Sequence, residues 1–388
     1  MKKYKLGEIL ELQRGYDLPF SQQKTGNVLV AGSNGIIGSH NEARSNHPCI
    51  TVGRSGSVGK IHYYEQPTWA HNTTLFVKDF KGNNPRFLYY FLKNLHLDKM
   101  FAKGSSVVPS LDRKVVHSLI VPFPKDIVFQ QRIASILSTL DRKIALNRSI
   151  NHNLEAMAKQ LYDYWFVQFD FPDENGKPYK SSGGKMVWNE KLKIEIPEGW
   201  NVKSIFDELS IQYGFPFSTE LFVEELTSIP IVRIRDILSN SVSAYTIEQT
   251  DDRFRLHMRD LLIGMDGNFH MNYWSDNISY LNQRSVRLRA IKNSSVSIVQ
   301  ARYGIEPHIK AKELRAKGST VGHLSDKDLK GLFILVPSIK ELRITLDSML
   351  DKIIHNRIEI NNLTKQRDSL LPLLMNGQVS LNYDLSND

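Results

Sequence analysis

Two long segments of this 388-residue chain share one apolar pattern, and this repeat constrains the fold more than any other feature. In both segments the seam positions follow one another at alternating steps of four and three residues, with a constant offset between the two copies. This spacing is typical of a helix that buries one narrow seam against another helix. The first seam comprises Ile133, Leu137, Leu140, Ile144, Asn147, Asn151, Leu154, Ala158, Leu161 and Trp165, and the second comprises Leu342, Leu346, Met349, Ile353, Asn356, Ile360, Leu363, Arg367, Leu370 and Leu374.

Each predicted helix spans roughly 50 Å at about 1.5 Å per residue, and its seam can be buried only against the other helix or against helices of a partner. Asn147 and Asn356 occupy the same point of the two seams, and Asn151 adds a second polar position to the first seam. Polar seam residues fix the register of paired helices. We therefore expect Asn147 and Asn356 to face each other, or a partner's helices, near the centre. Pro372 should end or kink the second helix near Leu371.

The segments that precede the two helices are also related. GSSVVPSL (Gly104 to Leu111) has its echo in GSTVGHLS (Gly318 to Ser325), and GEILELQRGYDLPFS (Gly7 to Ser21) in FDELSIQYGFPFS (Phe206 to Ser218). The period is too long for a solenoid, so each copy should be a domain followed by a helix. A duplicated chain with near two-fold symmetry is suited to binding two separated sites on one extended ligand.

The repeated domains have the pattern of a mixed α/β fold. PRFLYYFLKNLHLDKMF (Pro85 to Phe101) begins with proline and has apolar residues at helical spacing, which predicts one helix. The segment from Asp170 to Gly199 is rich in Gly, Pro, Ser and charge, which predicts a linker with room for one hairpin. Runs rich in β-branched and aromatic residues predict strands at Asn27 to Gly32, Cys49 to Gly53, Lys60 to Tyr64 and Thr73 to Val77. The run SLIVPFP (Ser118 to Pro124) predicts a short buried strand that stops at Pro122.

The chain carries a formal net charge of +9 and has a pI near 9.3, which favours a polyanionic partner such as nucleic acid. Its single cysteine, Cys49, excludes an intramolecular disulfide and suits a reducing cytoplasm. No apolar run has the length of a signal peptide or a membrane span, so we expect a cytoplasmic protein. No Cys or His spacing fits a zinc site, and no catalytic motif is found. We therefore expect no metal, no cofactor and no catalytic residue.

A glycine-rich turn lies between two of the predicted strands, in GRSGSVGK (Gly53 to Lys60). Arg54 and Ile61 depart from the pattern of a nucleotide phosphate-binding loop. Such a turn can still let the backbone approach a DNA strand closely. A tight hairpin whose charges are only solvated explains the same residues equally well. The candidate DNA contacts are Arg54, Ser55, Ser57 and Lys60.

The second copy has a similar glycine turn in GMDGNFHMNYW (Gly264 to Trp274), with Asp266, Asn268 and His270 at its tip. Similar scaffolds with different tips are expected of two readers of different DNA sequences, because Asn suits adenine, Arg suits guanine and Asp suits cytosine. A strand in LNQRSVRLR (Leu281 to Arg289) could present a polar face to DNA, although a solvated strand face is equally compatible. The candidates there are Gln283, Ser285, Arg287 and Arg289, with Arg284 beside them.

Both copies also pair a glycine with two hydroxyl residues. Ser105 and Ser106 occupy this place in the first copy, and Ser319 and Thr320 in the second. Their hydroxyl groups could bind phosphate or cap a helix.

These features together resemble the specificity subunit of type I restriction–modification enzymes over essentially the whole chain. The residues that carry the resemblance are TVGRSGSVGKIHYYEQPTWAHNTTLFV (Thr51 to Val77), GSSVVPSLDRKVVHSLIVPFP (Gly104 to Pro124), FQQRIASILSTLDRKIALNRSINHNLEAMAKQLYDYWF (Phe129 to Phe166), IPEGW (Ile196 to Trp200) and LLPLLMNGQVSL (Leu370 to Leu381). The resemblance implies two α/β target-recognition domains joined by two long antiparallel coiled-coil helices, with an internal pseudo-two-fold repeat. The expected boundaries are 1–125 for the first domain, 126–168 for the first spacer helix, 169–195 for a linker, 196–337 for the second domain, 338–376 for the second spacer helix and 377–388 for a tail.

The resemblance further implies a non-catalytic subunit whose two domains each read one half of a bipartite site in double-stranded DNA. In this family the helices set the gap between the half-sites and carry two modification (methyltransferase) subunits, and motor–nuclease subunits join them. A chain of this kind could also serve a type IIB-like or fused nuclease–methyltransferase. Two alternatives from other classes are a stand-alone enzyme acting on nucleotides and a duplicated protein-interaction adaptor.

Overall fold

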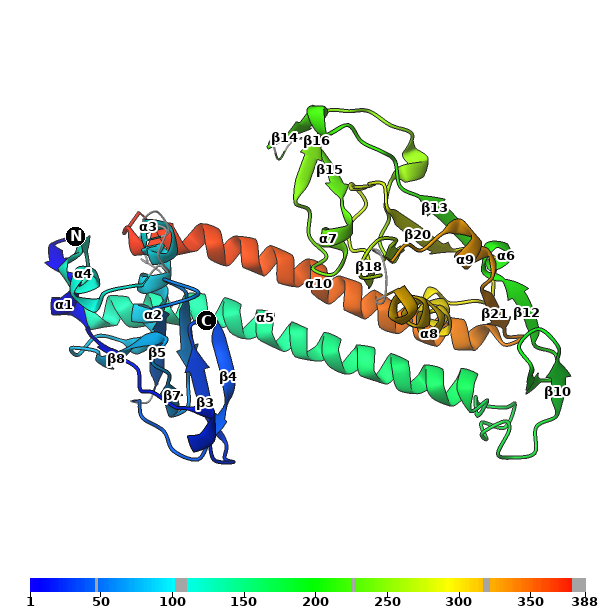
Figure 1. Ribbon diagram of the computed structural model, residues 1–388, viewed down its shortest axis with the longest axis horizontal. Coiled ribbons are helices and arrows are strands. Elements are labelled where there is room, and N and C mark those ends of the chain that lie inside the picture. Colours follow the sequence, from blue (N-terminus) through cyan, green and yellow to red (C-terminus); the bar gives the residue numbers. More distant parts are fainter. Residues whose placement is uncertain (46–47, 102–109, 225, 227, 317–321, 379–388) are drawn as a thin grey trace, which may run out of the picture. The chain divides into compact units, whose positions relative to one another are not determined.

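The computed structural model describes residues 1–45, 48–101, 110–224, 226, 228–316 and 322–378 (Figure 1). The chain divides into two compact units, of which unit 1 comprises residues 1–144 and 362–388 and unit 2 comprises residues 145–361. Two long helices, α5 (Ile127–Tyr162) and α10 (Lys340–Met375), contribute residues to both units. Each unit therefore combines one α/β domain with one stretch of each long helix.

Unit 1 contains two main sheets. The first is antiparallel, with the order β2 (Glu11–Arg14), β8 (Thr74–Asp79), β5 (Cys49–Gly53) and β6 (Ile61–Tyr64). The second has the order β4 (Gly35–His40), β3 (Val28–Gly32) and β7 (Thr68–Ala70), in which β3 is antiparallel to β4 and parallel to β7. A further pair joins β1 (Lys3–Lys5) to β9 (Ile120–Pro122). The strands that the sequence predicts in this domain are confirmed, although Ile120 of β9 is exposed.

The remaining helices of unit 1 are α1 (Leu6–Ile9), the 3₁₀ helix η1 (Phe20–Gln22), α2 (Pro85–Asn94), α3 (Leu97–Phe101) and α4 (Arg113–Ser118). The side chain of Asn84 caps α2 by accepting the amide hydrogen of Phe87, and Pro85 stands in the first turn. The prediction of one helix over 85–101 is wrong. His96 has a φ of +49° between α2 and α3, and an L-residue in this conformation cannot continue a right-handed helix.

Unit 2 repeats these sheet orders. Its antiparallel sheet has the order β13 (Leu209–Tyr213), β20 (Ser285–Ala290), β17 (Leu261–Gly264) and β18 (Met271–Tyr273). Its second sheet has the order β14 (Phe222–Val223), β16 (Ala244–Thr246), β15 (Ile229–Val232) and β19 (Tyr280–Leu281), and β15 is again antiparallel to one neighbour and parallel to the other. As in unit 1, a terminal pair joins β12 (Asn201–Ser204) to β21 (Phe333–Val336). The main difference is β14, which adds an edge strand to the second sheet of unit 2.

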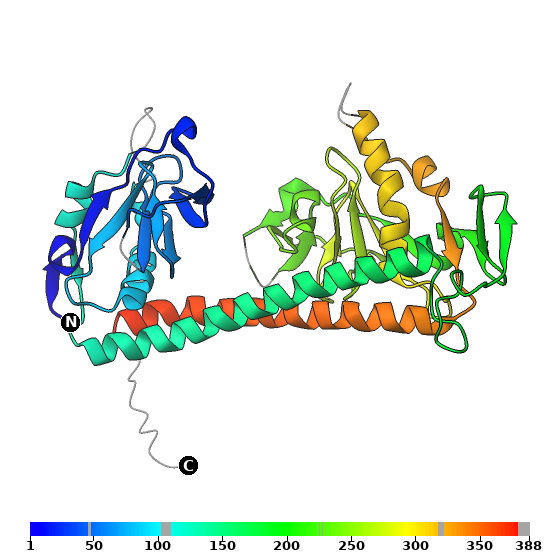
Figure 2. The same cartoon turned by 90° about the horizontal axis from the view of Figure 1, so that it is seen from below.

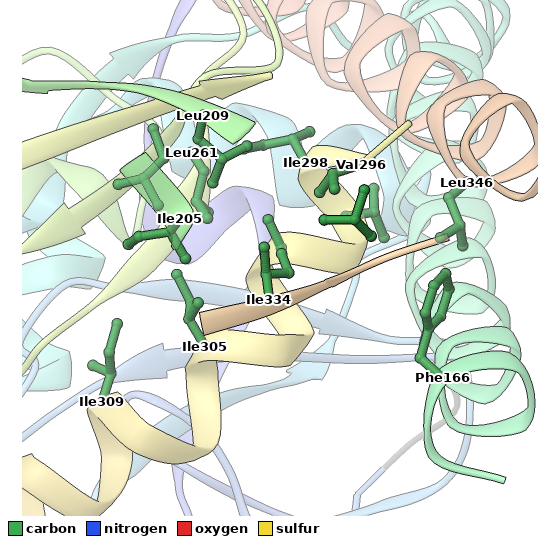
Figure 3. Packing of buried hydrophobic residues seen from close by; sticks show 14 of the residues in the cluster. Phe166, Ile205, Leu209, Leu261, Val296, Ile298, Ile305, Ile309, Ile334 and Leu346 are labelled. Atoms are coloured by element: carbon green, nitrogen blue, oxygen red, sulfur yellow. The ribbon is translucent and has the colours of Figure 1, made fainter. Parts of the chain in front are cut away.

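The helices of unit 2 cover and connect these sheets. They are the π-helix η2 (Asp163–Val167), α6 (Ile205–Glu208), the 3₁₀ helix η3 (Thr219–Leu221), α7 (Ile234–Ile237), the 3₁₀ helix η4 (Asp252–Phe254), α8 (Ile298–Ala316) and α9 (Asp326–Lys330). Figure 3 shows part of the core, to which Leu261 of β17, Ile305 of α8, Ile334 of β21, Leu346 of α10 and Phe166 of η2 contribute. The stretches of both long helices in unit 2 therefore share one core with its sheet. The fold is mixed α/β, as predicted.

The two long helices bury the predicted seams, because every predicted seam position is buried or half-buried. In unit 2 the helices lie side by side and antiparallel (Figures 1 and 2), since Asn147 contacts Glu359 while the later Asn151 contacts the earlier Ile353. In unit 1, the charged seam residue Arg367 forms an ion pair with Asp141 across the helices at 2.8 Å.

Pro372 does not end α10 near Leu371, since the helix continues to Met375. Pro372 lacks the amide that would bond the carbonyl of residue 368, and its ring crowds that carbonyl. Leu374 and Met375, both 2% exposed, pack into the core of unit 1. Burial of two large apolar side chains is worth more than one helical hydrogen bond near a helix end.

The segment predicted as a linker contains the expected hairpin, formed by β10 (Met186–Asn189) and β11 (Ile194–Pro197). Its aromatic residues correct the rest of that prediction. Phe171 stacks on Trp200 at 4.9 Å and on Tyr179 at 4.7 Å between ring centroids, and it is 2% exposed. The segment is therefore part of the packed core of unit 2 and not a free connector.

Candidate nucleic-acid interface

The glycine-rich turn of unit 1 is the hairpin loop between β5 and β6. The amide of Gly53 donates to the carbonyl of Lys60 at 2.7 Å, and Gly56 has a φ of +81°, which favours glycine. Two other segments are fixed beside this loop. The amide of Arg54 donates to the carbonyl of Thr73, and the amide of Leu111 donates to the carbonyl of Arg54, both at 2.8 Å.

Unit 2 contains the same backbone network around the loop between β17 and β18. The amide of Gly264 donates to the carbonyl of His270 at 2.9 Å. The amide of Met265 donates to the carbonyl of Arg284 at 2.8 Å, and the amide of Leu324 donates to the carbonyl of Met265 at 2.7 Å. Arg54 of unit 1 is therefore structurally equivalent to Met265 of unit 2, Thr73 to Arg284 and Leu111 to Leu324. The β-bridge between Ser55 and Ser110 likewise corresponds to the bridge between Asp266 and His323.

A fourth segment reaches each cluster through a glycine with no room for a side chain. The amide of Gly15 donates to Thr74, and that of Gly214 donates to Ser285, both at 3.0 Å. A Cβ atom on Gly15 would lie 2.1 Å from the carbonyl oxygen of His71, and one on Gly214 would lie 1.9 Å from that of Asn282. We call these two sets of converging segments the unit 1 tip (residues 15–16, 54–60, 71–73 and 110–111) and the unit 2 tip (residues 214–215, 265–270, 282–284 and 323–324).

The unit 1 tip brings together the residues predicted in the first glycine turn. Arg54, Ser55 and Ser57 are half-buried, and the exposed Lys60 donates from Nζ to Oδ1 of Asn34 at 2.7 Å. A hollow of about 480 Å³ beside the tip is lined by Gln13, Arg14, Arg54, Leu75, Ser110, Leu111, Asp112 and Arg113. Sequence reasoning missed Arg14 and Arg113, because neither lies in a glycine turn, although Arg14 directly precedes Gly15, the glycine that the second copy repeats.

The unit 2 tip is built around Asp266. Its Oδ2 accepts from Nη1 of Arg284 at 3.0 Å, and its Oδ1 lies 2.6 Å from Nδ1 of His323. Asn268 and Gln283 are exposed, and His270 is half-buried. Sequence reasoning missed His323, although it lies in the echoed motif GSTVGHLS.

Four predicted contacts lie outside the described residues, namely Ser105, Ser106, Ser319 and Thr320. The prediction of a polar strand face over 283–289 is wrong for its strand residues. Ser285 is fully buried, and Arg287 is only 6% exposed. Arg289 donates to both oxygens of Asp260, at 2.6 and 2.7 Å. Burial lowers the pKa of the Arg287 guanidinium, and the neighbouring charge of Arg289 lowers it further. Only Gln283 and Arg284 of this segment remain candidates for contact with a ligand.

The asparagines of the helix seam pair differently from the prediction. Asn356 donates from Nδ2 to Oδ1 of Asn151 at 2.8 Å, whereas Asn147 donates to Oε2 of Glu359 at 2.6 Å. Asn147 and Asn356 thus each bond another residue of the facing helix. The residue of α10 that corresponds to Asn151 is Ile360, so the Asn151–Asn356 pair has no counterpart in the repeat.

We expect the double variant Asn151→Leu/Asn356→Leu to lose less free energy of unfolding than the sum of the losses in the two single variants. Each single change leaves one amide of the pair without its partner, which costs about 1–3 kcal/mol, whereas the double change removes both amides. Denaturant unfolding in a double-mutant cycle should give a coupling free energy of roughly 1–3 kcal/mol. Asn153→Leu, an exposed asparagine on the same helix, is the control and should change stability by less than about 0.5 kcal/mol. Additive single effects would contradict the pairing.

Among the residues that the structure describes, no group of three or more His, Cys, Asp or Glu side chains could hold a metal ion. Within the same described ranges, no helix has both the length and the apolar character needed to span a bilayer.

Known proteins resemble this chain in both sequence and fold. Residues 1–156 match the family of the type I restriction modification DNA specificity domain. The type I restriction enzyme MjaIX specificity subunit of Methanocaldococcus jannaschii is 26% identical over 321 residues, which cover 76% of this chain and 68% of that protein. The HindI specificity subunit of Haemophilus influenzae is 24% identical over 360 residues, covering 76% of this chain and 77% of that protein.

A solved structure has the same fold. The type I restriction–modification S subunit from M. genitalium matches with a TM-score of 0.63 at 16% identity, over 96% of each chain. The repeated sheet order and the two long helices are consistent with the family match at residues 1–156. The chain is thus similar to type I restriction enzyme specificity subunits, by the domain match at residues 1–156 and by relatives whose alignments cover 76% of the chain.

Proposed function

We propose that this chain is the DNA-specificity subunit of a type I restriction–modification complex and that each unit reads one half of a bipartite DNA site through its tip. The carrying observation is that both tips have the same backbone network but differ in side chains, with Ser55, Thr73 and Ser110 replaced by Asp266, Arg284 and His323. An identical scaffold with different side chains suits two readers of different base sequences. The net charge of +9 favours association with the DNA backbone.

The proposal includes the partners and the division of labour that the family suggests. The chain itself binds DNA without catalysing a reaction, and modification subunits and motor–nuclease subunits supply methylation and cleavage in the cytoplasm. The target-recognition domains correspond to residues 1–125 and 196–337, and α5 and α10 set the gap between the half-sites. Continuous helices of this length, with buried seams, suit the role of a spacer.

Mapping methylated bases genome-wide tests this proposal directly. Deleting the gene should abolish methylation at one motif, made of two short sequences separated by a fixed gap, and reintroducing the gene should restore it. Retention of every methylated motif in the deletion strain would contradict the proposal. Methylation or cleavage by the purified chain alone would instead support a stand-alone enzyme. Co-purification with separate methyltransferase polypeptides distinguishes the proposal from a fused nuclease–methyltransferase.

A further inference from the structure

The unit 2 tip contains a triad of ionisable side chains that the unit 1 tip lacks. Asp266 bonds Arg284 through one carboxylate oxygen and His323 through the other, at 3.0 and 2.6 Å. Its three members come from three separate segments of the chain, so the triad exists only in the folded unit. The equivalent positions of unit 1 carry hydroxyl groups, on Ser55, Thr73 and Ser110. At these three points of one scaffold, ionisable side chains in unit 2 thus replace hydroxyl side chains in unit 1.

The backbone of Arg284 is in an unusual conformation, with a φ of +64°. Thr73, the equivalent residue of unit 1, does not have a positive φ. This conformation is unfavourable for an L-residue, and residues held in it cluster at binding sites. Two backbone hydrogen bonds hold the chain at Arg284. The carbonyl of Arg284 accepts from the amide of Met265, and the amide of the preceding Gln283 donates to the carbonyl of Phe215 at 2.9 Å. The fold thus holds an arginine where glycine would be easier to accommodate.

The exposure of the triad shows which member can meet a ligand. The side chain of Arg284 is 70% exposed, whereas that of Asp266 is 21% exposed and has both oxygens engaged. A guanidinium has five N–H groups, and the bond to Asp266 uses one of them. Asp266 holds Arg284 through one oxygen and contacts His323 through the other, so it is placed to orient the arginine.

The charge of Asp266 also indicates what Arg284 binds. A carboxylate beside the arginine repels phosphate, so the pair is poorly suited to the DNA backbone. A guanidinium held in a fixed orientation suits the two acceptors of guanine in the major groove, O6 and N7. Building on the proposed function, we infer that Arg284 reads a guanine in the half-site bound by unit 2, with Asp266 and His323 as positioning residues.

The test uses the full chain assembled with its modification subunits and measures base preference at every position of the site with a randomised DNA library. Arg284→Gln should lower discrimination for guanine at one base pair by roughly 10- to 100-fold, as loss of one bidentate contact does. The other half of the site should be unaffected. Arg148→Gln, which removes one exposed arginine from α5 in the same unit, is the charge-matched control and should leave both halves unchanged.

Asp266→Asn separates positioning from direct reading. It should keep guanine as the preferred base with weaker discrimination, and it should strengthen binding to random-sequence DNA because a negative charge is lost. A switch to another preferred base in this variant would overturn the inference and make Asp266 the reader. An unchanged preference in Arg284→Gln, or uniformly weaker binding to all sequences, would overturn it too while the proposed function stands. A wild-type complex with no preferred site would overturn the proposed function itself.

Discussion

Truncation of Leu346 to alanine is expected to destabilise unit 2 by about 3–5 kcal/mol. Leu346 is fully buried, and it points from α10 into the core that Phe166 and Ile334 share (Figure 3). Removing most of the side chain from such a site loses its transfer free energy and leaves a cavity. Because this core joins a long helix to the sheet, the loss should loosen the domain on its helical support.

The measurement must resolve the two units, since a chain with two cores need not unfold in one step. Amide hydrogen exchange of the buried strands β17 and β20 reports the opening of unit 2, and that of β5 and β8 reports unit 1. In the Leu346→Ala variant, amide hydrogen exchange should accelerate in the strands of unit 2. Ile344→Ala, on the same helix and 64% exposed, should change stability by less than about 0.5 kcal/mol. Equal effects of the two substitutions would show that Leu346 is not part of the core.

The helix seams and the glycine turns could be predicted because their signals are local. A step of four and three residues fixes one helix face whatever lies opposite, and the buried positions from Ile133 to Trp165 follow it. A turn of the kind that contains Gly56 or Gly267 requires a positive φ, and glycine marks that requirement in the sequence.

The errors arose where distant residues decide the local structure. The sequence predicts that Pro372 ends or kinks the second helix, but α10 continues to Met375 because the packing of Leu374 and Met375 outweighs the lost hydrogen bond. Arg289 seemed available to DNA because its partner, Asp260, lies in another segment of the chain. An alternating pattern of apolar and basic residues is the same in a solvated strand and in an inner strand with buried ion pairs.

The candidate site shows the same division between local and distant signals. The glycine turn indicated Asp266 and Asn268, but nothing local related Asp266 to His323, which follows it by 57 residues. Likewise, no spacing in the sequence could tell that Asn356 bonds Asn151 and not Asn147. Only the folded chain decides which polar side chains become partners.

Gly214→Ala is expected to weaken recognition of one half-site by at least roughly 10-fold while recognition of the other is unchanged. The new Cβ atom would lie 1.9 Å from the carbonyl oxygen of Asn282 and 3.0 Å from the amide nitrogen of Gln283. Both neighbours are backbone atoms, so the turn at 282–284 must move and carry Arg284 with it. Overpacking of this kind typically costs about 1–3 kcal/mol. Displacing a reading segment should cost at least as much as one mismatched base pair, or roughly 10-fold in specific affinity.

Unit 1 contains the equivalent glycine, Gly15, so the same substitution can be tested in both units. Gly15→Ala places a Cβ atom 2.1 Å from the carbonyl oxygen of His71 and should impair only the opposite half-site. Gly176→Ala is the control, because Gly176 has a φ of +73° but a Cβ atom there would meet nothing within 4 Å. It should cost about 1–2 kcal/mol through backbone strain alone and leave base preference intact. Binding assays with sites mutated in one half at a time measure all three variants. If Gly214→Ala weakened both half-sites equally, the two tips would not read DNA independently, and the assignment of one half-site to each unit would fail.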